Sequence, residues 1–168
     1  MFNTVNHHHI LQSKLKEYKI MGLILNLLKS YLKDRSQSTV INNVVSEREF
    51  LNVGIPQGSC LGPLLFLVYI NDIFSATEVK LRLFADDACL SYQHSDPDFV
   101  NSVVNRELSK IDEWLRANKL FINYSKTKFL LFNRTAKKCD FSVMVNGFVI
   151  EQSENIKYLG VVLDEKHI

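Results

Sequence analysis

Two neighbouring carboxylates, Asp86 and Asp87, are the residues of this sequence best suited to chemistry. They interrupt the stretch Lys80–Tyr92, in which apolar and polar residues alternate on both sides of the acids. Alternation with a period of two around a short polar break predicts a hairpin of two strands with the acids at the bend. Adjacent carboxylates repel each other unless a cation offsets their charge, and Mg²⁺ takes such ligands together with water and phosphate oxygens. A solvated turn is the alternative, because Asp is common in turns.

A stretch rich in turn residues, Gly54–Pro63, precedes the apolar segment Leu64–Ile73. Gly58 and Gly62 allow a positive φ or a close approach to the backbone, and Pro63 suits the first turn of a helix. The apolar segment predicts a helix that is buried on nearly all sides. A glycine-rich loop before a helix suits phosphate or nucleotide binding, and an ordinary strand-to-helix connection is an equal alternative.

Two helices and a hairpin are expected before this loop. The spacing of apolar residues predicts helices over about residues 10–18 and about Leu23–Leu32. The packing stripe of the second helix comprises Leu23, Leu27, Leu28, Tyr31 and Leu32. Ser38–Ile41 and Glu49–Val53 predict two strands joined by a polar loop. His7–His9 are interpreted as solvated residues at a helix start, since consecutive helical residues point in different directions and rarely bind one metal ion.

The second half of the chain predicts a long helix and several strands. Asp96 and Pro97 form a helix start, and the helix runs to about Asn118. Asn146–Gly147 predicts the turn of a hairpin, and Ile156–Leu163 predicts a last strand. The packing stripe of the long helix is Val100, Val103, Val104, Leu108, Ile111, Trp114 and Leu115. Its opposite side, expected to be solvated, carries Arg106, Glu107, Lys110, Asp112, Glu113 and Arg116.

Length and composition predict one compact globular unit. The 168 residues are 46% hydrophobic and 23% charged, and the net charge of +2 neither requires nor excludes a nucleic-acid partner. Three widely separated cysteines favour a reducing, intracellular setting, nuclear or cytoplasmic. The longest apolar run, Leu64–Ile70, is too short to span a bilayer, and no secretory signal is evident. We therefore expect a protein that is neither secreted nor bound to a membrane.

An ordered set of motifs resembles reverse transcriptases, and more narrowly the palm subdomain of non-LTR retrotransposon polymerases. The motifs are the Gly54–Pro63 loop, Phe84-Ala-Asp-Asp87, Asn123-Tyr-Ser-Lys-Thr127 and Tyr158-Leu-Gly160. Three further fragments fit the same family: Phe2-Asn-Thr-Val-Asn-His7, Tyr31-Leu-Lys-Asp-Arg-Ser-Gln37 and Tyr69-Ile-Asn-Asp72. Each fragment alone is weakly specific, whereas their order and spacing are highly specific. The resemblance covers essentially the whole chain.

The resemblance implies a role for each match. Asp86 and Asp87 would bind Mg²⁺ or Mn²⁺ and, with Lys126 near the triphosphate, would catalyse two-metal phosphoryl transfer. Phe2 would lie under the nucleotide sugar and exclude a 2′-hydroxyl. The residues implied in nucleotide and template binding are Phe2, Pro56, Gln57, Gly58, Phe84 and Ala85, and the primer grip would be Tyr158, Leu159 and Gly160. The implied partners are an RNA template, a DNA primer and a dNTP, with no obligate protein partner.

The implied fold is α+β: an antiparallel sheet with helices on one face, forming a single palm fragment over residues 1–168. The chain departs from the family pattern near its start. A metal-binding Asp expected four residues before Met1 is absent, Asn3 stands where an Asp is usual, and an extra His lies within His7–His9. No fingers or thumb region is recognised, so we expect these residues alone to be inactive and to expose apolar surface. A decayed copy and a nucleic-acid-binding module are the alternatives to an enzyme segment.

Overall fold

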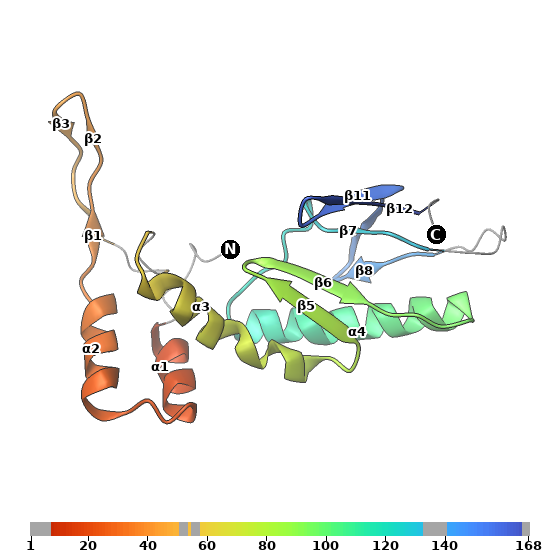
Figure 1. Ribbon diagram of the computed structural model, residues 1–168, viewed down its shortest axis with the longest axis horizontal. Helices are drawn as coiled ribbons and strands as arrows, with labels where there is room; N and C mark the ends of the chain where they lie inside the picture. The colour runs from red at the N-terminus through yellow and green to blue at the C-terminus, as the bar shows by residue number, and fades with distance from the viewer. Residues whose placement is uncertain (1–7, 51–53, 55–57, 133–140, 166–168) are drawn as a thin grey trace. The chain divides into compact units, whose positions relative to one another are not determined.

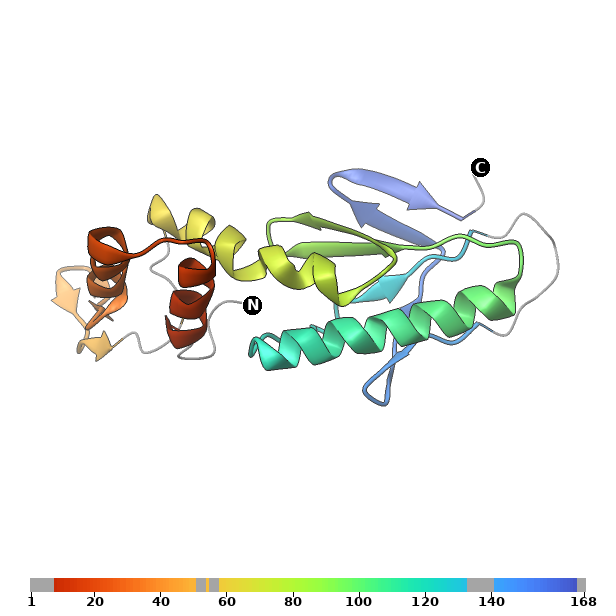
Figure 2. The ribbon, with the colours of Figure 1, turned by 90° about the horizontal axis from the view of Figure 1, so that it is seen from below.

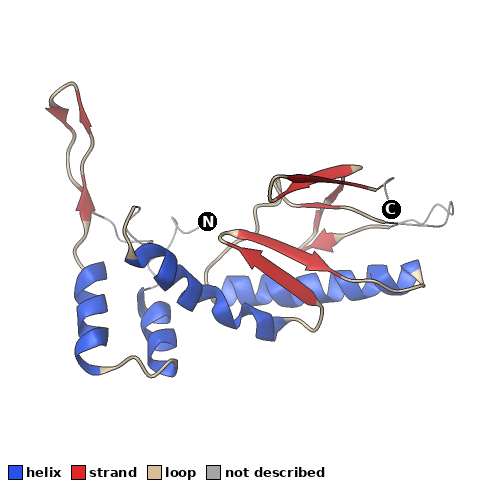
Figure 3. Ribbon diagram, in the orientation of Figure 1, coloured by secondary structure: helices blue, strands red, loops and turns tan. Residues whose placement is uncertain are grey.

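The computed structural model describes residues 8–50, 54, 58–132 and 141–165, and it mixes helices with short strands (Figures 1 and 3). The packing of the chain divides it into two compact units. Unit 1 comprises Met1–Phe74, Phe84–Asp87 and Asn118–Leu120, and unit 2 comprises Ser75–Leu83, Ala88–Ala117 and Phe121–Ile168. The single palm fragment over residues 1–168 stays a prediction, because a division into compact units does not identify a polymerase subdomain.

Three α-helices form the core in the described part of unit 1. α1 (His8–Glu17) packs against both α2 (Gly22–Leu32) and α3 (Leu61–Ile70), and a 3-10 helix, η1 (Asn71–Ala76), follows α3. α1 ends because Lys19 has a φ of 60°, which lets the Ile20 amide donate to the Leu15 carbonyl at 2.9 Å. The buried apolar residues are Leu11, Leu15, Leu25, Leu28, Leu32, Leu65, Tyr69, Ile70 and Ile73. The two helices predicted before the glycine-rich loop are confirmed.

The buried faces of α2 and α3 differ from the predicted ones. Leu23 and Leu27, expected in the packing stripe of α2, are 88% and 67% exposed, and the buried face is Leu25, Leu28 and Leu32. α2 is apolar around most of its circumference, so the periodicity of its sequence does not select one face. α3 was expected to be buried on nearly all sides, whereas Leu64 and Leu67 are exposed.

A buried lysine connects α1 to the end of α3. Lys14 Nζ donates to the Tyr69 carbonyl at 2.6 Å and to Asp72 Oδ1 at 2.5 Å, and it lies 5.1 Å from the centre of the Tyr69 ring. The Tyr69 hydroxyl donates to the Asn118 carbonyl at 2.7 Å. Burial, reinforced by the negative charge of Asp72, raises the pKa of Tyr69 to about 12. Lys14 is therefore part of the packed interior of unit 1.

A ribbon of four short strands follows α2 in unit 1 (Figure 1). β1 (Ser36–Gln37) pairs with β4 (Glu49–Phe50), and β2 (Val40–Ile41) pairs with β3 (Val44–Val45), both antiparallel. The chain reverses here as predicted, but the pairing differs: Val40–Ile41 pairs with β3 inside the expected polar loop, and Glu49–Phe50 pairs with β1. Residues 51–53 of the second predicted strand lie outside the described residues. Asn42 and Asn43 have φ of 50° and 62°, as a tight two-residue hairpin turn requires. Val40, Ile41, Val44 and Val45 are all exposed.

Unit 2 contains most of a hairpin and the longest helix. β5 (Lys80–Phe84) pairs with β6 (Asp87–Ser91), and α4 (Pro97–Ala117) follows. Asp96 Oδ1 accepts a hydrogen bond from the Asp98 amide at 3.0 Å, which confirms the predicted helix start. α4 lies alongside β8 (Met144–Val145), as Figure 2 shows.

The remaining strands of unit 2 build a small sheet on α4. β8 pairs with β9 (Phe148–Val149) in an antiparallel hairpin whose turn, Asn146–Gly147, is the predicted one. β10 (Glu151–Gln152) pairs in parallel with β7 (Lys128–Phe129). Residues 148–152 therefore run as one extended segment between two neighbours. The hydrophobic core between this sheet and α4 contains the buried residues Val143, Val145 and Ile150. Partly buried side chains pack against it: Val104, Leu108, Ile122, Tyr124, Phe129 and Phe141.

The predicted last strand is a hairpin. β11 (Asn155–Tyr158) and β12 (Val161–Asp164) pair antiparallel, so the interpretation of Ile156–Leu163 as a single strand is wrong. Leu159 and Gly160 have φ of 51° and 85°, and this pair of left-handed residues reverses the chain within two positions.

The α+β class is confirmed by this mixture of helices and small antiparallel sheets. The described strands pair as two-stranded sheets, and β7 with β10 is a parallel pair, so the predicted single antiparallel sheet is replaced by shorter ladders. Many of these strands are two residues long, so each ladder is short. In the part of the chain that the structure describes, none of the helices combines the length and the apolar character needed to cross a bilayer.

The side of α4 that was predicted to be solvated contains two buried acids. Glu107 is 0% exposed and Asp112 is buried as well, so the prediction is wrong at these two positions. Asp112 accepts a hydrogen bond from Arg116 at 2.7 Å. The sequence signal for Glu107 is a four-residue spacing that places it on the buried stripe Val103, Glu107, Ile111 and Leu115.

Hydrogen bonds keep Glu107 ionised in the interior. Burial opposes its ionisation, but hydrogen bonds from Lys110, the Glu78 amide, Arg106 and Thr77 outweigh burial and lower its pKa to about 2. The ordinary value is 4.5. Because the pKa is lower in the folded protein, Glu107 stabilises the fold above pH 4.5 and loses this effect as the pH falls toward 2.

We predict that Glu107→Gln flattens the acid side of the stability profile. Between about pH 5 and about pH 3, the free energy of unfolding should fall by about 2 kcal/mol more in the natural protein than in the variant. Urea unfolding followed by circular dichroism measures both profiles. Parallel profiles over this interval would contradict the account of Glu107.

Candidate functional site

The acids Asp86 and Asp87 lie at the predicted bend. Ala85 and Asp86 form the two-residue turn between β5 and β6, and Asp87 is the first residue of β6. Phe84, Ala85, Asp86 and Asp87 are all exposed, and along β5 the exposed residues alternate with half-buried ones. The hairpin predicted from the alternation is confirmed. The metal-binding role of the two acids stays a prediction.

Backbone strain marks the turn. Ala85 has a φ of 51°, in the left-handed region that Gly, Asn and Asp adopt more readily than Ala. This conformation costs an alanine about 1–2 kcal/mol. A positive φ at the first turn residue suits the twist of a hairpin, so the strain serves to present the two acids at a tight bend.

The donor set at the turn fits a divalent cation of the magnesium type. Asp86 and Asp87 offer exposed carboxylate oxygens, and Mg²⁺ commonly uses one or two carboxylates with water and phosphate oxygens. Within residues 8–50, 54, 58–132 and 141–165, no group of three or more His, Cys, Asp or Glu side chains is arranged to hold a metal ion. Two carboxylates fill only part of the octahedral shell of Mg²⁺ and leave its other positions to further oxygen ligands, such as water.

The glycine-rich loop contributes Gly58 to the described residues. Gly58 has a φ of +75°, and a Cβ built there would meet no atom within 4 Å, so its backbone borders open space. The Ser59 hydroxyl accepts a hydrogen bond from the Gly62 amide at 3.0 Å and caps the start of α3. Pro56 and Gln57, like Phe2, lie outside the described residues.

One of the clustered histidines is not simply solvated. His8 is half-buried, and its Nε2 lies 3.1 Å from the carbonyl oxygen of Gly54. Gly54 is the first residue of the glycine-rich loop. His9 is exposed, as predicted, and His7 lies outside the described residues.

Lys126 belongs to unit 2 and lies on a compact turn. The Lys126 and Thr127 amides both donate to the Asn123 carbonyl at 3.0 Å, which closes the turn. The Lys126 side chain is exposed, while its neighbour Lys128 forms an ion pair with Glu151 at 3.0 Å. The turn therefore leaves Lys126 accessible to an anionic ligand.

The three primer-grip candidates lie at the tip of the β11–β12 hairpin. Tyr158 is half-buried at the end of β11, and Leu159 and Gly160 form the turn. Gly160 has open space where a Cβ would lie. The tip carries no charged side chain at these three positions, and its role as a primer grip stays a prediction.

The predicted site residues fall into two groups. Phe84–Asp87 and Gly58 belong to unit 1, and Lys126 and Tyr158–Gly160 belong to unit 2. The chain brings Phe84, Ala85, Asp86 and Asp87 together in one turn.

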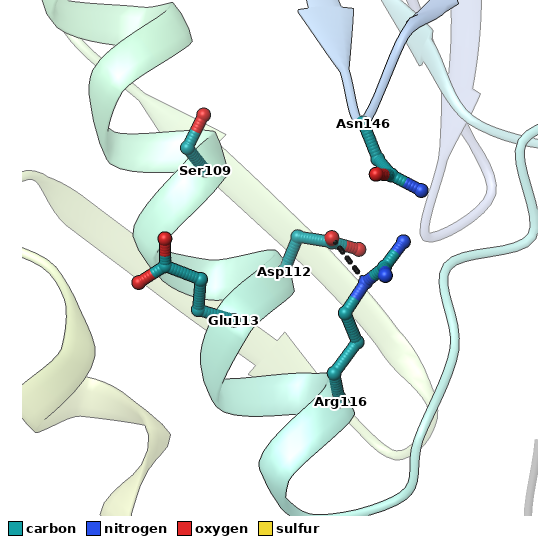
Figure 4. Close-up of a pocket in the computed structure, with 5 residues that line it drawn as sticks. All are labelled: Ser109, Asp112, Glu113, Arg116 and Asn146. Atoms are coloured by element: carbon teal, nitrogen blue, oxygen red, sulfur yellow. Dashed lines mark hydrogen bonds and ion pairs between the residues drawn. The ribbon is translucent and has the colours of Figure 1, made fainter.

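A pocket of about 240 Å³ lies in unit 2, and none of the predicted site residues lines it (Figure 4). It contains the Arg116–Asp112 ion pair, and hydrogen bonds to Tyr124 and Asp112 raise the pKa of Arg116. Its lining residues are Ser109, Asp112, Glu113, Arg116 and Asn146. Arg116 offsets the charge of Asp112, and Glu113 adds a second, exposed carboxylate to the lining.

The chain is similar in sequence to known proteins. A family model described as Reverse transcriptase (RNA-dependent DNA polymerase) matches residues 1–163. The chain is 31% identical to a probable RNA-directed DNA polymerase from transposon X-element of Drosophila melanogaster, over 95% of this chain and 18% of that protein. It is 27% identical to the RNA-directed DNA polymerase from mobile element jockey of Drosophila funebris, over 88% of this chain and 17% of that protein.

A third relative is similar to the same extent. The chain is 29% identical to a probable RNA-directed DNA polymerase from transposon BS of Drosophila melanogaster, over 83% of this chain and 16% of that protein. The chain thus spans less than a fifth of the length of each of these relatives. The resemblance to reverse transcriptases of non-LTR retrotransposons is confirmed, and the assignment to a palm subdomain stays a prediction.

We predict that Ala85→Gly stabilises the folded protein. Glycine adopts the positive φ of this position without the Cβ clash, so the free energy of unfolding should rise by about 1 kcal/mol. Ala88→Gly, three residues further along in β6, is the matched control and should destabilise by about 0.5–1 kcal/mol. Urea unfolding compares the two variants, and a loss of stability in both would argue against strain at Ala85.

Proposed function

The chain belongs to the reverse transcriptase family, and on this premise we propose that it carries the catalytic turn of an RNA-directed DNA polymerase from a non-LTR retrotransposon. In this proposal its helices and small sheets form part of a palm subdomain. The observation that best supports the proposal is the display of Asp86 and Asp87 at an exposed two-residue turn. An RNA template, a DNA primer and a dNTP are the proposed partners, in an intracellular setting.

Asp86 and Asp87 are the proposed metal ligands and catalytic residues. Their exposed oxygens would hold Mg²⁺ or Mn²⁺ beside the primer terminus. When bound, a pair of such ions lowers the pKa of the primer 3′-hydroxyl and neutralises the departing phosphates. In this proposal the strained backbone at Ala85 holds the turn in the conformation that presents the two side chains.

Residues beside the acids are proposed to bind the nucleotide and the template. Phe84 and Ala85 directly precede the acids, and the open space at Gly58 lets a nucleotide approach the backbone closely. Pro56 and Gln57 are proposed to bind the nucleotide or the template as well. Phe2 is proposed to lie under the nucleotide sugar, where its ring would exclude a 2′-hydroxyl.

Two segments of unit 2 are proposed to hold charged or extended parts of the substrate. The exposed ammonium of Lys126 would neutralise or protonate the pyrophosphate leaving group. Tyr158, Leu159 and Gly160 would contact the primer strand, because a tight hairpin tip presents backbone groups and one apolar side chain to it.

A nucleic-acid-binding remnant without catalysis is the second candidate. This candidate is favoured because, among the described residues, no third His, Cys, Asp or Glu side chain joins Asp86 and Asp87 to form a metal site. Positioned metal charge supplies much of the stabilisation in phosphoryl transfer, so two carboxylates alone would support little turnover. We therefore expect this chain by itself not to extend a primer.

We predict that binding of a dNTP to the chain and a primer–template depends on Mg²⁺ and on Asp86. Fluorescence anisotropy of a labelled dNTP should show weaker binding by on the order of tenfold when Asp86 is changed to Asn, because one ligand of the cation is lost. Asp34→Asn removes an equally exposed charge elsewhere and is the matched control, which should bind as the natural chain does. Parallel gels should show no primer extension.

Each outcome of this experiment favours one candidate. Affinity for nucleic acid that falls with salt but ignores both Mg²⁺ and Asp86→Asn identifies the remnant and overturns the polymerase proposal. Primer extension that requires Mg²⁺ and disappears in Asp86→Asn supports the polymerase proposal and overturns the expected inactivity.

A further inference from the structure

The buried carboxylate of Glu107 is the strongest polar centre outside the turn. Its side chain is 0% exposed, and both of its oxygens accept hydrogen bonds. An ionised group in the interior is tolerated only when such bonds replace its hydration. The proposed metal and nucleotide site does not include Glu107. The hydrogen-bond partners of Glu107 therefore indicate its role.

The two oxygens of Glu107 have different partners. Oε1 accepts from Arg106 Nε at 2.9 Å and from Lys110 Nζ at 2.8 Å, both on α4 itself. Oε2 accepts from the Thr77 hydroxyl at 3.0 Å and from the Glu78 amide at 2.9 Å. One oxygen is thus held by the helix, and the other holds the segment that leads into β5.

The segment held by Glu107 is short and directly precedes the hairpin. The Thr77 hydroxyl oxygen also accepts from the Val79 amide at 3.3 Å, and β5 begins at Lys80. Lys110 adds a longer ion pair to the Glu78 carboxylate at 3.5 Å. Residues 77–79 are therefore tied to α4 through a single carboxylate and its cations.

We propose that Glu107 is the positioning residue of the hairpin that carries Asp86 and Asp87. By tying residues 77–79 to α4, it fixes where β5 begins, and β5 leads directly to the turn that carries the two acids. The proposal rests on the function assigned above to Asp86 and Asp87, and it adds a residue that never touches metal or substrate.

The chemistry of the four donors explains why this position needs a carboxylate. Each oxygen of Glu107 faces two hydrogen-bond donors. A glutamine has a single oxygen, so its NH₂ group would face donors on one side, whichever way the amide is turned. Either the link to residues 77–79 or the pairing with the two cations is then lost.

The test compares Glu107→Gln with a core variant of similar instability. Ile111→Ala removes buried apolar volume one turn further along α4 and keeps Glu107 with all four of its hydrogen-bond donors, and both changes should destabilise the fold. Mn²⁺ is the probe, and its affinity is measured from the broadening of the Ala85–Asp87 amide resonances. Hydrogen exchange of the β5 and β6 amides is measured without metal in the same samples.

We predict that Glu107→Gln weakens Mn²⁺ binding by on the order of tenfold, the usual effect of losing an outer support of a metal site. Exchange of the β5 and β6 amides should accelerate in the same variant, while Ile111→Ala leaves both readouts unchanged. Thr77→Val, which removes one of the four donors and leaves the carboxylate of Glu107 in place, should show a smaller change of the same sign.

Equal effects of Glu107→Gln and Ile111→Ala on both readouts would overturn the proposal, because they would show a merely structural role. Absence of Mn²⁺ broadening in the natural chain would instead count against the function assigned to Asp86 and Asp87. Hydrogen exchange still decides the positioning role in that case, so the two failures are distinguishable.

Discussion

The compensated burial of one negative charge is the interaction on which the candidate site depends. Glu107 lies in the interior, and four donors from its own helix and from residues 77–78 keep it ionised. The strand that begins three residues after Thr77 leads to the two acids. Without its hydrogen-bond donors, the charge of Glu107 would destabilise the core. With them, Glu107 holds the start of the hairpin that presents Asp86 and Asp87.

Unit 1 uses a related device with the opposite sign. The ammonium of Lys14 is buried between the Tyr69 carbonyl, the Tyr69 ring and Asp72, where it joins α1 to the end of α3. The Phe84–Asp87 turn contains local backbone strain at Ala85. Strained residues persist where the surrounding structure fixes them, and they are common at functional sites. The turn that carries Asp86 and Asp87 has this character.

Local turn chemistry was the part of the fold that the sequence predicts best. Asp96–Pro97 and Asn146–Gly147 specify their turns through their own side chains and backbone preferences, and both predictions are confirmed. The position of Asp86–Asp87 at a bend followed from alternation alone. The exposed face of α2 and the burial of Glu107 were missed because they depend on partners far along the chain. The turn at Leu159–Gly160 was missed because Leu rarely adopts a positive φ.

The central claim is that Asp86 and Asp87 hold a divalent cation for nucleotide transfer. The most direct measurement is an anomalous difference map from crystals of the chain grown with Mn²⁺ and a dNTP. The account predicts a peak bonded to a carboxylate oxygen of Asp86 or Asp87 and to a phosphate oxygen of the nucleotide. A nucleotide bound without such a peak, or Mn²⁺ bound only at other acids, would contradict it.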